Sequence, residues 1–149
     1  MEYNITKWIK WDRGYIRESV RIYHGGGFKL GDLSWISDDC YIDAQGIIEI
    51  GNDVLIGPHT QIYSSEHGID PQFLIREQHH IMKKTIIGND VWIGAGVIIT
   101  GGVTIGNHVI IGAGSVVTHN IPEWEIWAGI PAKRIGDRRN CVVAKNNSG

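Results

Sequence analysis

Residues 87–122 divide into six consecutive hexads, which read IGNDVW, IGAGVI, ITGGVT, IGNHVI, IGAGSV and VTHNIP. The same frame occurs upstream as IGNDVL, IGPHTQ and IYSSEH over residues 50–67. Every hexad begins with Ile or Val, whose large, β-branched side chains suit an inward-facing position on a strand. Most continue with Gly and then Asn, Asp or Gly, residues that accept tight turns and left-handed conformations. The fifth position is usually small or β-branched, as expected of a side chain that fills a corner.

A period of six fits neither an amphipathic helix, which repeats every ~3.6 residues, nor hairpin strands, whose turns recur about every 8–12 residues. It predicts a parallel β-helix in which three hexads form one coil. The expected coils are residues 30–49, 50–67, 87–104 and 105–122. The first of these is looser, because the period slips by two residues between Ile48 and Ile50. We therefore predict an all-β solenoid of stacked coils.

Composition narrows the class of protein. The length of 149 residues indicates one domain. The net charge of −2 gives no reason to expect a nucleic-acid partner. Two cysteines, Cys40 and Cys141, are too few for a disulfide framework, and neither lies in a motif that suggests a nucleophile. The sequence shows no apolar run long enough to span a bilayer and no signal-peptide pattern. We expect a soluble, cytoplasmic protein without an integral membrane segment.

The two ends of a solenoid need caps against edge pairing. We expect residues 1–29 to form the N-terminal cap, with Trp8, Trp11, Tyr15 and Tyr23 packed over the first coil. The alternative for this segment is a basic, aromatic surface for a membrane or a glycan. Residues 30–122 are expected to form the β-helix domain, and residues 123–149 a C-terminal cap and tail. In that cap, Trp124 and Trp127 are expected to cover the last coil.

The hexads stop after His67. The interval from Ile62 to Ile87 is not a multiple of six, so residues 64–85 must leave the β-helix as a protruding loop. Long loops on a rigid scaffold are disproportionately functional, although a neutral insertion is the alternative. His67 is expected on an outward corner at the end of a coil, where the loop departs. Imidazole suits general-base chemistry near neutral pH.

The hexads, the segment IYSSEHGIDP (62–71) and the segment from Ile86 to Ile135 resemble the hexapeptide-repeat O-acetyltransferases of the sugar and capsular-polysaccharide type. The resemblance implies a left-handed β-helix and an acetyl-CoA-dependent enzyme with His67 as its catalytic base. It also implies a homotrimer with active sites between subunits. The acetyl group would pass directly from acetyl-CoA to a saccharide hydroxyl, without a covalent acyl-enzyme.

The same resemblance implies residues for binding acetyl-CoA. Ala95 and Ala113, in the IGAG hexads, match positions where backbone amides approach the pantetheine arm, and the Ala95 N–H matches the donor near the thioester. Thr118 matches a threonine near the adenosine end, although His119 replaces the lysine that often follows it. For each of these residues the alternative is a role in lining a turn or the solvated surface.

Three further residues belong to the expected acetyl-CoA site. Lys133 and Arg134, in GIPAKRI, are candidates for binding the phosphates of CoA, because a cation suits a phosphate. The alternative for both is a solvated surface. Trp92 is a candidate either for flanking the acyl donor or for packing between subunits.

Recognition of the acceptor is expected from carboxylates that bind sugar hydroxyls. The candidates are Asp43, Asp38 and Asp70. Asp43 is the best placed of these to face His67, because it lies on the preceding coil near the corner. The acceptor is expected to be a saccharide or a sugar nucleotide. N-acetylation of an amino-sugar nucleotide and a non-catalytic β-solenoid scaffold are the alternative functions. No metal is expected, because the adjacent His79 and His80 would point apart in an extended chain.

Overall fold

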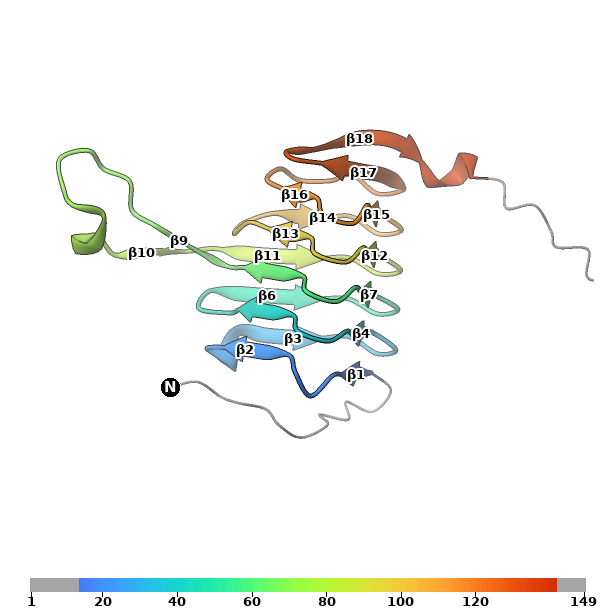
Figure 1. Ribbon diagram of the computed structural model, residues 1–149, viewed down its shortest axis with the longest axis horizontal. Coiled ribbons are helices and arrows are strands. Elements are labelled where there is room, and N and C mark those ends of the chain that lie inside the picture. Colours follow the sequence, from blue (N-terminus) through green and yellow to red (C-terminus); the bar gives the residue numbers. More distant parts are fainter. Residues whose placement is uncertain (1–13, 142–149) are drawn as a thin grey trace, which may run out of the picture.

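The computed structural model describes residues 14–141, which form an all-β solenoid of about six coils without an α-helix. Figure 1 shows the coils stacked along one axis, with a hairpin arm that projects from their side. Three sheets form the walls, their strands come from successive coils, and their pairings are parallel apart from that of β17 with β18. The predicted fold class is thereby confirmed.

The first sheet contains β1 (Tyr15–Ile16), β4 (Trp35–Ile36), β7 (Leu55–Ile56), β12 (Trp92–Ile93), β15 (Ile110–Ile111), β17 (Glu125–Gly129) and β18 (Ala132–Asp137). The second sheet contains β2 (Arg21–Tyr23), β5 (Tyr41–Asp43), β8 (Gln61–Tyr63), β13 (Ile98–Ile99) and β16 (Val116–Val117). The third sheet contains β3 (Phe28–Leu30), β6 (Ile47–Ile50), β11 (Lys84–Ile87) and β14 (Thr104–Ile105). Short 3₁₀ segments are η1 (Gly25–Gly27), η2 (Ile75–Glu77) and η3 (Arg138–Asn140).

The interior is built from the residues that begin the hexads. All nine of these aliphatic residues are buried, as are the small or β-branched residues at the fifth position of the coils. Corresponding residues of successive coils pair directly, so that Ile62 lies beside Ile99 and Ile99 beside Val117. The inward-facing role predicted for the lead position is therefore confirmed.

The corner between the third and first sheets shows how the coils keep register. Asn107 Oδ1 accepts from the Asn89 N–H, 18 residues away, and Asn89 Oδ1 accepts from the Asn52 N–H, 37 residues away. Asn52 Oδ1 accepts in turn from the Asp32 N–H, 20 residues away. The early coils are therefore longer than 18 residues, which explains the two-residue slip, and the interval of 37 contains the arm.

Turn residues at this corner adopt the left-handed conformation that the hexads predict. Asp53 and Asp90 have φ of 58° and 52°. His108 and Trp124, which are bulkier, have φ of 64° and 70° and stack on each other with ring centroids 3.9 Å apart. The His108 side chain also bonds to Asp90, with Nδ1 2.8 Å from Oδ2. A column of paired side chains therefore runs along this corner.

The ends of the solenoid differ from simple caps. Residues Tyr15–Leu30 already contribute β1, β2 and β3 to the three sheets, so the described part of the segment expected as an N-terminal cap forms a coil. Trp8 and Trp11 lie outside the described residues. At the other end, β17 adds a parallel strand beside β15, with Trp127 paired to Ile111, and β18 folds back antiparallel.

The arm is an antiparallel hairpin of β9 (Ser65–His67) and β10 (His80–Met82), with η2 near its tip. It departs after the buried Ser64, between the second and third sheets. Apolar side chains on it are exposed, including Ile69 at 81% and Phe73 at 59%. No helix in residues 14–141 has the length and apolar character needed to cross a membrane.

A pair of substitutions on β13 tests the inward register. Ile99→Ala should lower the free energy of unfolding by about 2–5 kcal/mol, because it opens a cavity in a fully buried column. Ile98→Ala, on the outward face of the same strand and only partly buried, should cost about 1 kcal/mol or less. Urea denaturation followed by circular dichroism measures both, and equal losses would contradict the register.

Candidate active site

His67 is the last residue of β9 and is exposed on the arm. Its position is three residues beyond Ser64, rather than at the end of a coil as the period suggested, because β9 pairs with β10 and not with a sheet of the solenoid. The partner opposite His67 is His80, and the two rings meet edge to face, with centroids 4.3 Å apart and planes at 74°. Two imidazoles therefore meet on the hairpin.

A polar cluster connects this hairpin to the neighbouring coil. Gln45 Oε1 lies 3.2 Å from His80 Nδ1, and Gln45 Nε2 donates to Asp43 Oδ2 and to Ser65 Oγ, each at 3.4 Å. Ser65 Oγ donates to the same Asp43 oxygen at 2.9 Å, and the Gln45 N–H donates to Asp43 Oδ1 at 3.2 Å. Asp43 is only 6% exposed, so protein donors surround its carboxylate.

Tyr63 lies beside Asp43 in the pairing of β8 with β5. Burial, and secondarily the charge of Asp43, raise the pKa of the Tyr63 phenol above its usual value. The phenol therefore stays protonated near neutral pH, and its Oη donates to Gln61 Oε1 at 2.7 Å. Tyr63 is thus a hydrogen-bond donor in this region and not a base.

The other two candidate carboxylates lie apart from Asp43. Asp70 lies on the arm beyond His67, where its Oδ1 accepts from the Gln72 N–H at 2.9 Å and its backbone bonds to the Gln78 side chain. Asp38 lies at the corner between the first and second sheets, near Arg17 Nε at 3.8 Å. The structure therefore brings Asp43 to the root of the arm and places Asp38 at a different corner.

Ala95 and Ala113 occupy equivalent positions on that corner between the first and second sheets. Both are exposed, and neither N–H donates to an acceptor within residues 14–141. The coils approach closely here: a Cβ on Gly94 would lie 2.5 Å from the Ala113 nitrogen. Only glycine permits this stacking. Trp92, 56% exposed, lies on β12, which enters the corner. The result is a row of free backbone donors beside an exposed indole.

Thr118 does not belong to this row. It follows β16 and lies at the corner between the second and third sheets, where its Oγ1 is 2.9 Å from His119 Nδ1. His67 and Thr118 therefore lie at one edge of the second sheet, and Ala95 and Ala113 at the other.

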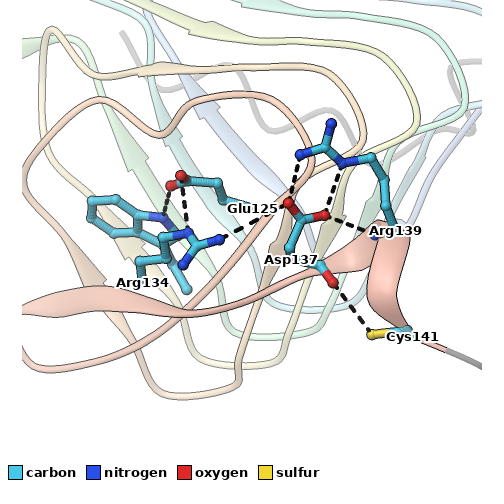
Figure 2. Close-up of polar contacts among 6 residues, drawn as sticks. Glu125, Arg134, Asp137, Arg139 and Cys141 are labelled. Carbon is cyan, nitrogen blue, oxygen red and sulfur yellow. Dashed lines mark hydrogen bonds and ion pairs between the residues drawn. The ribbon is translucent and has the colours of Figure 1, made fainter.

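Lys133 and Arg134 lie on β18 and are both exposed. Arg134 belongs to a network that Figure 2 shows: its Nε is 3.1 Å from Glu125 Oε1, and its Nη2 is 3.9 Å from Asp137 Oδ2. Lys133, by contrast, forms no ion pair with another described residue. Lys133 is therefore the more available of the two cations.

The C-terminal network continues to Arg139. Hydrogen bonds from the Arg139 guanidinium and backbone N–H lower the pKa of Asp137 to about 2. At the corner between the third and first sheets, hydrogen bonds from His108 and, to a smaller extent, Arg138 lower the pKa of Asp90. The ion pair of Arg138 with Asp90 therefore joins η3 to a coil, whereas that of Arg139 with Asp137 lies within the C-terminal segment.

The structure also describes Cys40 and the two adjacent histidines. Burial raises the pKa of the Cys40 thiol to about 11, so it is a poor nucleophile near neutral pH. Among residues 14–141, no three His, Cys, Asp or Glu side chains come together as ligands for a metal ion. His79 and His80, in particular, do not join a third ligand there.

Sequence comparison identifies the family. A family model for bacterial transferase hexapeptide (six repeats) matches residues 84–119. A hexapeptide-repeat-containing acetyltransferase from Vibrio cholerae is 32% identical, with a TM-score of 0.79 over 84% of this chain and 70% of that chain. The chain belongs to the hexapeptide-repeat acetyltransferases. A second structure of the Vibrio cholerae protein, with a TM-score of 0.77, is its complex with acetyl-CoA.

Two further relatives agree with this family assignment. A maltose O-acetyltransferase from Clostridium difficile 630 is 39% identical, with a TM-score of 0.75 over 82% of this chain and 65% of that chain. Nodulation protein L of Rhizobium meliloti is 39% identical over 123 residues, which are 81% of this chain and 66% of that protein. This hexapeptide-repeat chain spans 44% to 66% of the length of several curated relatives, which therefore carry additional sequence.

The low pKa of Asp137 predicts an acid-sensitive C-terminal segment. Because this pKa is depressed, the carboxylate stabilises the fold fully above its ordinary value of 3.8, and the stabilisation is lost as the pH falls toward about 2. Asp137→Asn should therefore lower the melting temperature at pH 7, and the difference from the wild type should vanish near pH 2. Asp53→Asn, at an exposed turn, is the control. A difference that does not change with pH would contradict the assignment.

Proposed function

We propose that this protein transfers the acetyl group of acetyl-CoA to a hydroxyl group of a saccharide, with His67 as the general base. The observation that carries the proposal is the exposed His67 imidazole on an arm rooted in a rigid solenoid. Such an imidazole is accessible to a substrate, and imidazole is the side chain that most often serves as a general base. Similarity to a maltose O-acetyltransferase supports a sugar hydroxyl as the acceptor.

In the proposed reaction, His67 removes the proton of the acceptor hydroxyl as its oxygen attacks the thioester carbonyl carbon. The Ala95 N–H, which has no acceptor among the described residues, donates to the carbonyl oxygen as negative charge develops there. When the carbon–sulfur bond breaks, His67 returns the proton to the departing thiolate. The products are the acetyl ester and free CoA, and no acyl-enzyme is needed.

The donor fits the residues at the corner between the first and second sheets and on β18. The Ala95 and Ala113 N–H groups can donate hydrogen bonds to amide carbonyls of the pantetheine arm, and Trp92 can cover it. We assign the phosphate contacts to Lys133 first, because Arg134 is already paired with Glu125. Thr118 remains the candidate for the adenosine end. It lies at the edge of the second sheet opposite to Ala95 and Ala113.

The arrangement supports an active site shared between copies of the chain. Within one copy, His67 and the Ala95–Ala113 row lie at opposite edges of the second sheet. If both act in one reaction, they come from different subunits. We therefore propose a homotrimer, in which His67 of one subunit faces the donor bound along the coils of the next.

Acceptor recognition divides between the arm and the neighbouring coil. Asp70 keeps one carboxylate oxygen free of described partners and can bind an acceptor hydroxyl. Asp43 lies at the root of the arm, but both of its oxygens already accept hydrogen bonds from the protein. An amino group is the alternative nucleophile, and a scaffold without catalysis is the alternative function.

Removing the base should abolish turnover without abolishing donor binding. His67→Ala should lower kcat by about 10²–10⁴-fold, the usual contribution of a general base. The measurement is thiol release from acetyl-CoA over a panel of sugars and amino sugars, with donor affinity measured by calorimetry. His79→Ala, an exposed histidine beside the hairpin, is the matched control. Equal rates for His67→Ala and the wild type would refute the base, and donor binding without turnover on any acceptor would favour the scaffold.

The role of Lys133 is separable from the chemistry. Lys133→Ala should raise KM for acetyl-CoA by about tenfold, because one phosphate contact of about 1–2 kcal/mol is lost. With S-acetylpantetheine, which has no phosphates, wild type and variant should have the same kcat/KM. Lys29→Ala, a distant exposed lysine, serves as the control. A loss of equal size with both donors would place Lys133 elsewhere in the mechanism.

A further inference from the structure

Few contacts orient the side chain of His67, the residue with the proposed catalytic role. Its side chain makes no hydrogen bond or ion pair with any residue of 14–141, and its only ring contact is with His80. An exposed imidazole that nothing orients would sample several rotamers and reach the attacking position only part of the time. The orientation of His67 therefore depends on what holds His80.

Gln45 holds His80, and its own orientation is fixed by the groups behind it. The amide nitrogen faces the Asp43 carboxylate and Ser65 Oγ, each at 3.4 Å. The reversed amide would set a carbonyl oxygen against the carboxylate, two acceptors without a proton between them. The amide oxygen must therefore face His80, as it does at 3.2 Å.

This geometry fixes the tautomer of His80. Because Gln45 Oε1 can only accept, the proton of the contact must reside on His80 Nδ1. In neutral His80 the Nε2 atom is then unprotonated. The chain of contacts runs from the buried Asp43 of the solenoid through Gln45 to His80, and from the His80 ring to His67. The chain as a whole connects the exposed hairpin to a buried carboxylate of a coil.

We propose that His80 is a positioning residue for His67, set in one tautomer and one orientation by Gln45, which Asp43 and Ser65 hold in place. This inference rests on the proposed function of His67. His80 does not itself exchange a proton with the substrate. It packs its ring against the base and so limits the rotation of the His67 imidazole. Asp43, with its oxygens engaged by the protein, acts through this network and not on the acceptor.

The tautomer is measurable without any activity assay. Histidine side chains labelled with ¹⁵N give different nitrogen shifts for the two tautomers, and His80→Ala and His67→Ala identify the signals among the seven histidines. We expect His80 in the Nδ1–H form at a pH where it is neutral. Gln45→Leu, which removes the acceptor, should release it to the Nε2–H form. An Nε2–H tautomer in the unaltered protein would overturn the proposal.

Kinetics test whether the network positions the base. His80→Ala should lower kcat by about 10- to 100-fold, the scale of a misplaced reacting group, while KM for acetyl-CoA changes little. Gln45→Leu should lower kcat in the same way, and His79→Ala should leave it unchanged. A merely structural role would instead lower the melting temperature and the amount of active enzyme, and would leave kcat per active site intact.

The outcomes separate the two proposals. If His67→Ala is inactive and His80→Ala turns over at the full rate, the positioning role is overturned and the proposed function stands. If His67→Ala is as active as the wild type, both the general base and its positioning are overturned. Loss of kcat in His80→Ala and Gln45→Leu, together with the change of tautomer, supports the complete chain from Asp43 to His67.

Discussion

One steric requirement governs this structure: an aliphatic side chain must enter the common interior at every sixth residue. The columns that result are fully buried, and members such as Ile62, Ile99 and Val117 lie in direct register from coil to coil. A single added residue within a strand would turn the following side chains outward. Extra sequence can therefore be accommodated only at a corner, and the arm leaves at the corner after Ser64.

This requirement also separates the two halves of the proposed chemistry. The corner that bears Ala95 and Ala113 is part of the repeat, so its free N–H groups recur at the coil spacing and suit an extended donor. His67, in contrast, lies on sequence that the repeat excludes. The second sheet lies between these two groups within one chain. An assembly of several copies is the simplest way to bring them together, and it makes the geometry of the interface part of the catalytic geometry.

Much of the fold was predictable because the hexad encodes both packing and turn geometry. The lead aliphatic residues, the left-handed turn at Asp53 and the departure of the chain after Ser64 are all visible in the sequence. The first coil was not, since its longer repeat around Ile16 and Ile22 falls outside the hexad frame. The strand that Trp127 adds beyond Pro122 was likewise hidden, because it departs from the pattern of the preceding hexads.

The candidate site was only partly predictable. His67 could be singled out by its place at the break, but its position on the hairpin could not, because the register of β9 and β10 depends on contacts that no repeat specifies. The pairing of His67 with His80 and the bonds of Gln45 to Asp43 follow from that register. The sequence did offer one guide, because polar residues on the coil before the break face the arm that leaves the solenoid there. Asp43 was recognised in this way, as a candidate ligand for the acceptor.

The division between coil and arm has a consequence for specificity. A substitution in the coil interior changes a packed column and lowers stability, whereas the arm beyond the His67–His80 pair is exposed and contributes nothing to the core. The arm can therefore vary in sequence without unfolding the solenoid, provided that its root keeps the contacts from Asp43 to His80. On this argument, the proposed donor contacts lie on the repeat and on β18, and the proposed acceptor contacts lie on the arm. The polar cluster at the root joins the two, because under the proposed mechanism it orients His67 on a rigid scaffold.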